Sequence, residues 1–171
     1  IEPKLTKLGI VGSTDAGKST SLELAKREDP PEQSTSNLYA VIMPLQTTQT
    51  THVALLDGDG REYDHQVEIA RNADFLLVFV DHNYGEDKTA KLNARITEHD
   101  DFLRQIEGVL RNRGGIPRLH IVLNKRDLWE NSKSADDLKT WFNAHVQQLE
   151  RLAGVGRLTA GFHSNKLTED L

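Results

Sequence analysis

Gly12-Ser-Thr-Asp-Ala-Gly-Lys-Ser19 is the stretch that decides the fold of this 171-residue chain. It fits the pattern G-x-x-x-x-G-K-[ST] and stands between an apolar run, Leu5 to Val11, and an amphipathic stretch, Gly17 to Arg27. Glycines let a backbone wrap closely around phosphates, and the free N–H groups at a helix start attract anions. A glycine-rich turn that matches by chance is the alternative, but the strand before and the helix after favour a phosphate-binding loop. Its residues would be Gly12, Ser13, Thr14, Asp15, Ala16, Gly17, Lys18, Ser19 and Thr20.

The rest of the chain alternates apolar runs with amphipathic stretches, which is typical of α/β domains. We expect strands over Leu5–Val11, Leu38–Leu45, Thr51–Asp57, Asp74–Asp81, Leu119–Leu123 and Arg157–Phe162, and helices over Gly17–Arg27, Asp64–Arg71, Arg95–Arg113 and Ala135–Leu152. The second and third strands should form an antiparallel pair. The polar stretch His82 to Ala94 is expected to be a surface excursion. These elements predict a three-layer α/β fold with a mostly parallel sheet and one antiparallel strand. Residues 1–171 are expected to be a single domain of a longer protein, without the fold's final helix.

Composition excludes several classes of function. The formal net charge is −5, so no general attraction to nucleic acid or anionic membrane is expected. The absence of cysteine rules out disulfides, thiolate metal sites and a cysteine nucleophile. No signal peptide and no apolar run of membrane-spanning length is evident, so a cytoplasmic protein is expected.

A second motif, Asn124-Lys-Arg-Asp127, follows the apolar run Leu119 to Leu123. Open α/β sheets bind ligands at the carboxyl ends of their strands, where this motif should lie. The Asp127 carboxylate can accept from the N1–H and 2-amino groups of guanine, a pair of donors that adenine lacks. Asn124 can bond the other edge of the base, and the stem of Lys125 can lie along the ring plane. A helix-capping aspartate is the alternative, but the motif's place behind a phosphate loop favours guanine.

These two motifs, in this order, resemble the Ras-like, translation-factor-related class of P-loop GTPases, and the resemblance covers nearly the whole chain. In that class a D-x-x-G motif follows the third strand, and here Asp57-Gly-Asp-Gly60 follows Thr51 to Leu56. The resemblance implies that Asp57 holds Mg²⁺ through water and that the Gly60 N–H senses the γ-phosphate. Taken alone, the same stretch would be a tight glycine turn.

The resemblance also implies two weaker assignments. A switch threonine that binds Mg²⁺ only with GTP is expected before the second strand, and Thr35 is our candidate, with Ser34 and Ser36 as rivals. The expected magnesium ligands are therefore Ser19, Thr35 and Asp57. The fifth motif of the class supplies a backbone N–H to guanine, and Ser164-Asn165-Lys166 matches it loosely, because Asn165 stands where a small residue is usual.

Two residues depart from the common pattern. Arg61 follows Gly60 where many relatives have a water-orienting glutamine, and arginine cannot accept a proton from water. It could stabilise transition-state charge, although a solvated surface arginine is the simpler interpretation. Asp15 stands where glycine is common; it could hold K⁺ beside the phosphates, or it could only shape the loop.

The sequence predicts a domain that binds GTP and GDP with Mg²⁺ and hydrolyses GTP slowly as a molecular switch. Lys18, Thr35, Gly60 and Arg61 are the candidates for catalysis, and no general base is evident. Intrinsic turnover is therefore expected to be slow, or to need a partner, dimerisation or K⁺. A GTP-binding regulatory or assembly module without useful hydrolysis is the main alternative, and an ATPase is disfavoured by Asn124 and Asp127. An effector protein, or the rest of the same polypeptide, is the expected partner.

Overall fold

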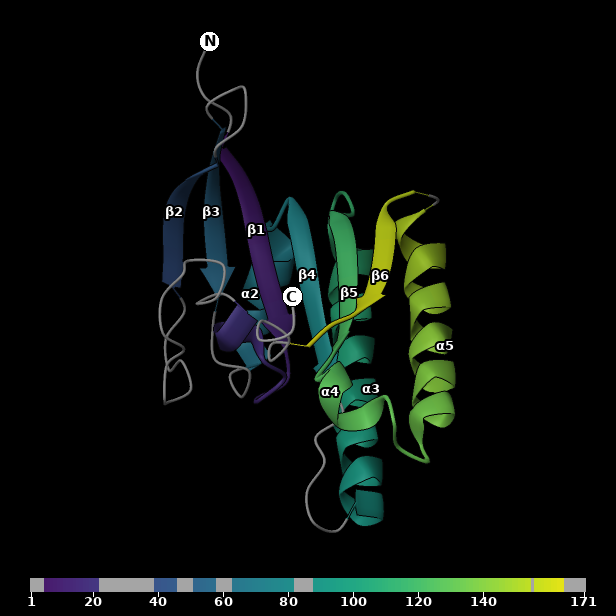
Figure 1. Ribbon diagram of the computed structural model, residues 1–171. Helices are drawn as coiled ribbons and strands as arrows, with labels where there is room; N and C mark the ends of the chain where they lie inside the picture. Colours follow the sequence, from purple (N-terminus) through teal and green to yellow (C-terminus); the bar gives the residue numbers. More distant parts are fainter. Residues whose placement is uncertain are drawn as a thin grey trace.

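A six-stranded sheet organises the computed structural model (Figure 1), which describes residues 5–21, 39–45, 51–57, 63–81, 88–154 and 156–164. The strands lie in the order β2-β3-β1-β4-β5-β6. Their bounds are β1 Leu5–Gly12, β2 Tyr39–Leu45, β3 Thr51–Asp57, β4 Phe75–Asp81, β5 Arg118–Asn124 and β6 Leu158–Phe162. β2 runs antiparallel to β3, and every other neighbouring pair is parallel. The expected mostly parallel sheet with one antiparallel strand is confirmed.

The central strands are continuous apolar runs because both faces of the sheet are covered there. β4 reads Phe-Leu-Leu-Val-Phe-Val-Asp, and its last four residues are all buried. The last four residues of β1 and of β5 are buried as well. The three strands therefore bury their carboxyl ends most deeply, and polar side chains at those ends need partners inside the protein.

Four helices have both ends within the described residues: α2 Tyr63–Asn72, α3 Lys88–Asn112, α4 Arg126–Trp129 and α5 Ala135–Ala153. In the view of Figure 1, α2 and α3 lie behind the sheet and α5 lies at its right. The main core forms where these helices meet the sheet, and its largest fully buried apolar side chains include Ile69, Leu76, Ile106, Leu110, Ile121, Leu123, Trp129, Leu138 and Phe142. α5 reaches this core through an apolar face, as its spacing predicts.

The packing of α2 on the sheet depends on a glycine in β1. A Cβ atom built on Gly9 would lie 2.6 Å from Ile69 Cγ2 and 2.9 Å from Ala73 Cβ. Real Cβ atoms do not approach so closely, so this position admits only glycine while α2 stays in place. On the opposite face, Ile10, Phe79 and Val122 form a second buried cluster with Ala16. The phosphate loop is therefore anchored to the sheet through Ala16.

Two of the expected elements differ from the structure. The predicted start of the helix at Arg95 is wrong, because α3 begins at Lys88, within the stretch interpreted as a surface excursion. Residues 88–94 include two lysines, two alanines and a leucine, which favour a helix even without an apolar stripe. The short helix α4, which begins inside the Asn-Lys-Arg-Asp motif and ends beyond it, is not among the expected elements. The helix expected over Gly17–Arg27 is described only as far as Ser21, where Lys18–Ser21 is helical. Within the described residues, no helix is both long and apolar enough to cross a bilayer.

Candidate functional site

The carboxyl ends of the parallel strands meet at one edge of the sheet, the lower edge in Figure 1. β1, β3, β4 and β5 end there on Gly12, Asp57, Asp81 and Asn124. Gly12 lies opposite Phe79 in the sheet, and Asp81 lies opposite Asn124. β1 stands between β3 and β4, where the strand order reverses, and such switch points are where open α/β sheets bind ligands.

The phosphate loop closes over its own lysine. Lys18 is 6% exposed, and its Nζ donates to the carbonyl oxygens of Gly12 at 2.7 Å and Ser13 at 3.0 Å. The loop turns through a hydrogen bond from Ala16 N to Ser13 O, and the following helix starts with a bond from Ser21 N to Gly17 O. The ammonium group is thus held within the loop, at the start of a helix, where an anion would be attracted.

Backbone geometry explains two residue choices in this loop. Gly12 has φ of +156°, and a Cβ there would lie 2.5 Å from the carbonyl oxygen of Phe79 in the adjacent strand. Asp15 has φ of +60°, a left-handed conformation that non-glycine residues rarely adopt. Aspartate tolerates that region better than most residues, which supports a loop-shaping role for Asp15 and leaves K⁺ binding untested.

Asn124 joins the second motif to the phosphate loop. Its side chain is fully buried, and its Nδ2 donates to the carbonyl oxygen of Ala16 at 2.9 Å. Its own carbonyl oxygen accepts from Trp129 Nε1 at 2.8 Å. Its Oδ1 is buried and has no hydrogen-bond partner among the described residues. An unsatisfied buried acceptor beside the phosphate loop indicates a site that is completed by a ligand or by water.

The other motif residues lie around the strand end. Lys125 has φ of +56°, which turns the chain sharply out of β5 and into α4. Asp127 is exposed, and its Oδ1 accepts from the hydroxyl of Ser164 at 2.6 Å. Arg126 N donates to the carbonyl oxygen of His163, which fixes the segment after β6 beside the motif. The structure therefore brings Asp127 and Ser164 together, as the sequence interpretation requires.

The structure adds four residues that the sequence interpretation missed, of which Gln66, Asp81 and His99 are buried and Arg95 is largely buried. Gln66 on α2 accepts from the N–H of Gly12 at 2.9 Å. Asp81, at the end of β4, meets Arg95 and His99 from α3. Burial alone would raise the pKa of Asp81, but the hydrogen bond from His99 and the positive charges of Arg95 and Lys125 together hold that pKa well below its usual range. The sequence signal that could have identified Asp81 is a charged residue at the end of a continuous apolar strand.

Several predicted site residues lie outside the described residues, namely Thr35, Gly60, Arg61, Asn165 and Lys166. Asp57 ends β3, but its side chain is not described. β3 runs parallel to β1 and ends at the same sheet edge as the phosphate loop, which carries Ser19. A hydroxyl and a carboxylate are oxygen donors of the kind that Mg²⁺ prefers, so the chemistry of these two residues fits that ion.

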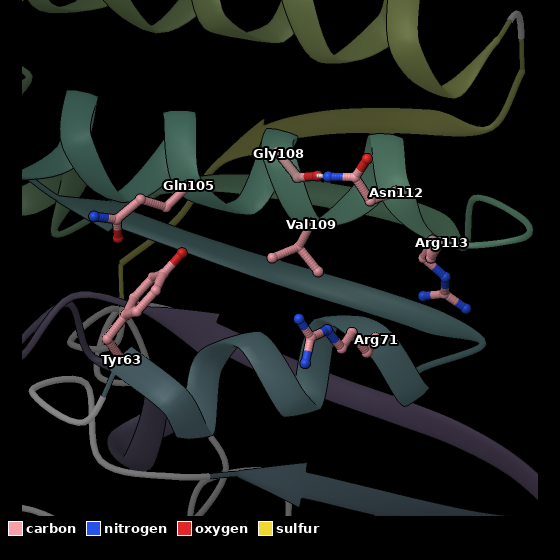
Figure 2. Close-up of a pocket in the computed structure, with 7 residues that line it drawn as sticks. All are labelled: Tyr63, Arg71, Gln105, Gly108, Val109, Asn112 and Arg113. Carbon is pink, nitrogen blue, oxygen red and sulfur yellow. Dashed lines mark hydrogen bonds between the residues drawn. The ribbon is translucent and has the colours of Figure 1, made fainter.

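A cavity of about 550 Å³ lies between α2 and α3. Figure 2 shows Tyr63 and Arg71 from α2 facing Gln105, Val109 and Asn112 from α3 across it. None of its lining residues is a predicted site residue, and none ends a strand of the sheet. The convergent polar groups at the sheet edge therefore identify the candidate site better than cavity volume does.

Comparisons with known proteins support the architecture. No protein-family model matches the chain, and no curated protein matches it by sequence. Among solved structures it is similar to Methanosarcina barkeri Roco2 RocCORdC bound to GDP, with a TM-score of 0.60 and 19% sequence identity. The match covers 96% of this chain and 45% of that one, so the chain spans less than half of that protein. With the sheet order and the phosphate loop, this similarity shows that the chain has a P-loop NTPase fold of the kind found in GTPases.

Proposed function

We propose that this domain binds GTP and GDP with Mg²⁺ and hydrolyses GTP slowly as a molecular switch. The observation that carries the proposal is the hydrogen bond from Asn124 to the carbonyl oxygen of Ala16. It ties the motif that would recognise the base to the loop that would hold the phosphates. The two motifs are more than 100 residues apart in sequence, and their direct contact at a strand-order reversal is the arrangement expected of one nucleotide site.

Asp127 and Ser164 support guanine as the base. The Ser164 hydroxyl donates to Asp127 Oδ1 and so fixes the plane of the carboxylate. A carboxylate held in this way can accept from both N1–H and the 2-amino group of guanine. Adenine would leave the carboxylate unpaired, which costs discrimination energy of several kcal/mol in sites built to bond such donors. The GDP in the structurally similar Roco2 protein is consistent with this choice.

The chemistry proposed is hydrolysis of the γ-phosphate. A water oxygen forms a bond to the γ-phosphorus, the bond from phosphorus to the β–γ bridging oxygen breaks, and GDP leaves with the electron pair. The protons of the water stay with the released phosphate, one of them passing to another phosphate oxygen. The Lys18 ammonium group, now bonded to loop carbonyls, would turn to the β- and γ-phosphate oxygens and balance their charge. Mg²⁺, held by Ser19 and Asp57, supplies further charge compensation when bound. Loop N–H groups would orient the phosphates, and Thr35 and Gly60 would respond to the γ-phosphate.

A binding module without useful hydrolysis is a second candidate, and Arg61 favours it. Arginine has no acceptor atom with which to orient the attacking water, as the carbonyl oxygen of a glutamine does. Slow turnover could still be raised by K⁺ at Asp15, by a second copy or by another protein. We also propose that the domain acts in the cytoplasm within a longer polypeptide or with an effector protein, with no direct role for nucleic acid or membrane.

The test is titration calorimetry of nucleotide-free protein with GDP, GTP and ATP in the presence of Mg²⁺, followed by phosphate release from GTP in KCl and in NaCl. We expect the wild-type protein to bind GTP and GDP more tightly than ATP. Asp127→Ala should abolish this preference for guanine, and Lys18→Ala should abolish the binding that depends on the β- and γ-phosphates. Guanine binding without phosphate release in either salt would support the binding module. A folded, nucleotide-free protein that binds ATP as well as GTP would refute guanine recognition.

A further inference from the structure

A buried carboxylate connects the two loops of the site by a second route, separate from the Asn124 bond. Asp81 has a fully buried side chain at the end of β4, between the strands that carry the two motifs. Its Oδ2 lies 2.7 Å from Lys125 Nζ, in the loop assigned to the base. Its Oδ1 accepts from Arg95 Nε at 2.8 Å and from Arg95 Nη2 at 2.5 Å. A carboxylate with cations on both oxygens satisfies the requirement that buried charges be paired.

Arg95 carries this connection onward to the phosphate loop. The same Nη2 that bonds Asp81 also donates to the carbonyl oxygen of Thr14 at 2.6 Å. Arg95 Nη1 donates to Glu98 Oε2 at 2.7 Å on its own helix, which fixes the guanidinium plane. The Arg95 side chain is only 10% exposed, so its bonds to Asp81 and Thr14 are partly shielded from water. A rigid, planar group with several donors can hold two acceptors at once, which a lysine ammonium on a flexible stem does less well.

His99 adds a third link from the same helix. Its side chain is fully buried, its Nδ1 lies 3.3 Å from Ser13 Oγ, and its Nε2 lies 3.0 Å from Asp81 Oδ1. Ser13 and Thr14 are consecutive residues of the phosphate loop. Two neighbouring side chains of α3 thus connect this corner of the loop to one carboxylate.

Backbone strain marks the two ends of the connection. Asp15 and Lys125 are the two non-glycine residues with positive φ in the described part of the chain. Asp15 follows the Thr14 carbonyl that Arg95 holds, and Lys125 itself forms an ion pair with Asp81. Strained conformations of this kind persist only where the surrounding contacts enforce them, and they concentrate at functional sites. Asp81 and Arg95 therefore hold the base loop at its strained residue and the phosphate loop beside its own.

We propose that Arg95, paired with Asp81, is a positioning residue that sets the phosphate loop for the β-phosphate. This inference rests on the proposed guanine-nucleotide function. Arg95 lies outside both sequence motifs, and its guanidinium group is bonded to Asp81, Glu98 and the carbonyl oxygen of Thr14. It would act on the phosphate loop through that carbonyl group. If the Thr14 carbonyl is released, the loop N–H groups that follow it lose their common orientation. Affinity for the β-phosphate should then fall more than affinity for the base and α-phosphate.

The experiment compares GDP with GMP on nucleotide-free protein. The ratio of the GMP dissociation constant to the GDP dissociation constant gives the contribution of the β-phosphate. We expect Arg95→Gln to lower this ratio about tenfold or more, because it removes charge-assisted bonds, while GMP affinity stays within about threefold of wild type. Arg95→Lys keeps the positive charge beside Asp81, but a lysine is less able to bond Asp81 and the Thr14 carbonyl oxygen at the same time. It should lower the ratio by a smaller factor. It also carries the test if Arg95→Gln does not fold.

Arg104→Gln is the matched control, because Arg104 lies on the same helix in an exposed pair with Asp101. It should leave the ratio unchanged. Equal losses of GMP and GDP affinity in the Arg95 variants would mean a purely structural role and would overturn the inference, as would an unchanged ratio. If wild-type protein binds neither nucleotide, the proposed function fails and this inference fails with it. Wild-type binding with an unaltered ratio in the variants would reject the positioning role alone.

Discussion

Replacing Asn124 by alanine should destabilise the protein even without nucleotide. The fully buried Asn124 Nδ2 donates to the carbonyl oxygen of Ala16 at 2.9 Å, and the substitution leaves that carbonyl without its donor. Loss of one partner of a buried hydrogen bond costs about 1–3 kcal/mol, because the other group stays desolvated. Urea unfolding at roughly 2 kcal/mol per molar should then show a midpoint lowered by about 0.5–1.5 M.

Asn112→Ala is the matched control for this prediction. Asn112 Nδ2 also donates to a backbone carbonyl oxygen at 2.9 Å, that of Gly108, but this bond is exposed on α3, beside the cavity between α2 and α3 (Figure 2). Its removal should change the free energy of unfolding by less than about 0.5 kcal/mol. If both variants unfold at the same urea concentration, the bond from Asn124 to Ala16 does not hold the two loops together. The two motifs would then not be held together as one nucleotide site.

Three further predictions follow from described contacts. Gly9→Val should lower the free energy of unfolding in urea by about 1–3 kcal/mol or more, because its Cβ would lie 2.6 Å from Ile69 Cγ2. Arg113→Met should cost roughly 1–2 kcal/mol in the same assay, because Arg113 donates to the carbonyl oxygen of Ala70 at 2.6 Å near the end of α2; an unchanged midpoint would contradict this. Burial lowers the pKa of His120 from its ordinary value of 6.5, so the folded state takes up this proton less readily than the unfolded state. Stability should fall as pH drops below about 6.5, and His120→Gln should flatten that slope in unfolding measured from pH 7.5 to 5.

The strands could be predicted from the sequence because each is a short, largely apolar run that is flanked by polar or turn-forming residues. β3 has the predicted bounds, Thr51–Asp57, and β1 exceeds its predicted range by a single residue. α3 was predicted only from Arg95 because the apolar positions that mark its buried face begin further along, at Phe102. Its first turns lack such a stripe, and amphipathic periodicity cannot detect a helical segment without an apolar face.

The motif residues could be predicted for a similar reason: their backbone roles are local. Gly12 needs a positive φ and a close approach to Phe79, and Lys18 follows at a spacing set by one loop. A pattern of consecutive residues captures both needs. Asp127 and Ser164 required a tertiary contact over 37 residues, which the family resemblance supplied and the hydrogen bond supports. Thr35 and Arg61 lie outside the described residues, so their roles stay predictions.

Asp81 shows where motif reasoning stops. In the sequence it is one of 26 acidic residues, and nothing adjacent marks it as more than the polar end of a strand. Its partners come from a helix 14 and 18 residues later and from the loop after the next strand. Parallel strands bring their carboxyl ends to one edge of the sheet. A charge at the end of a buried central strand therefore has to pair with polar groups from the neighbouring loops and helices at that edge. The two loops of the candidate site follow β1 and β5, and β4 lies between these strands. A carboxylate at the end of β4 can therefore contact groups that hold both loops, which is why a residue outside every motif belongs to the candidate site.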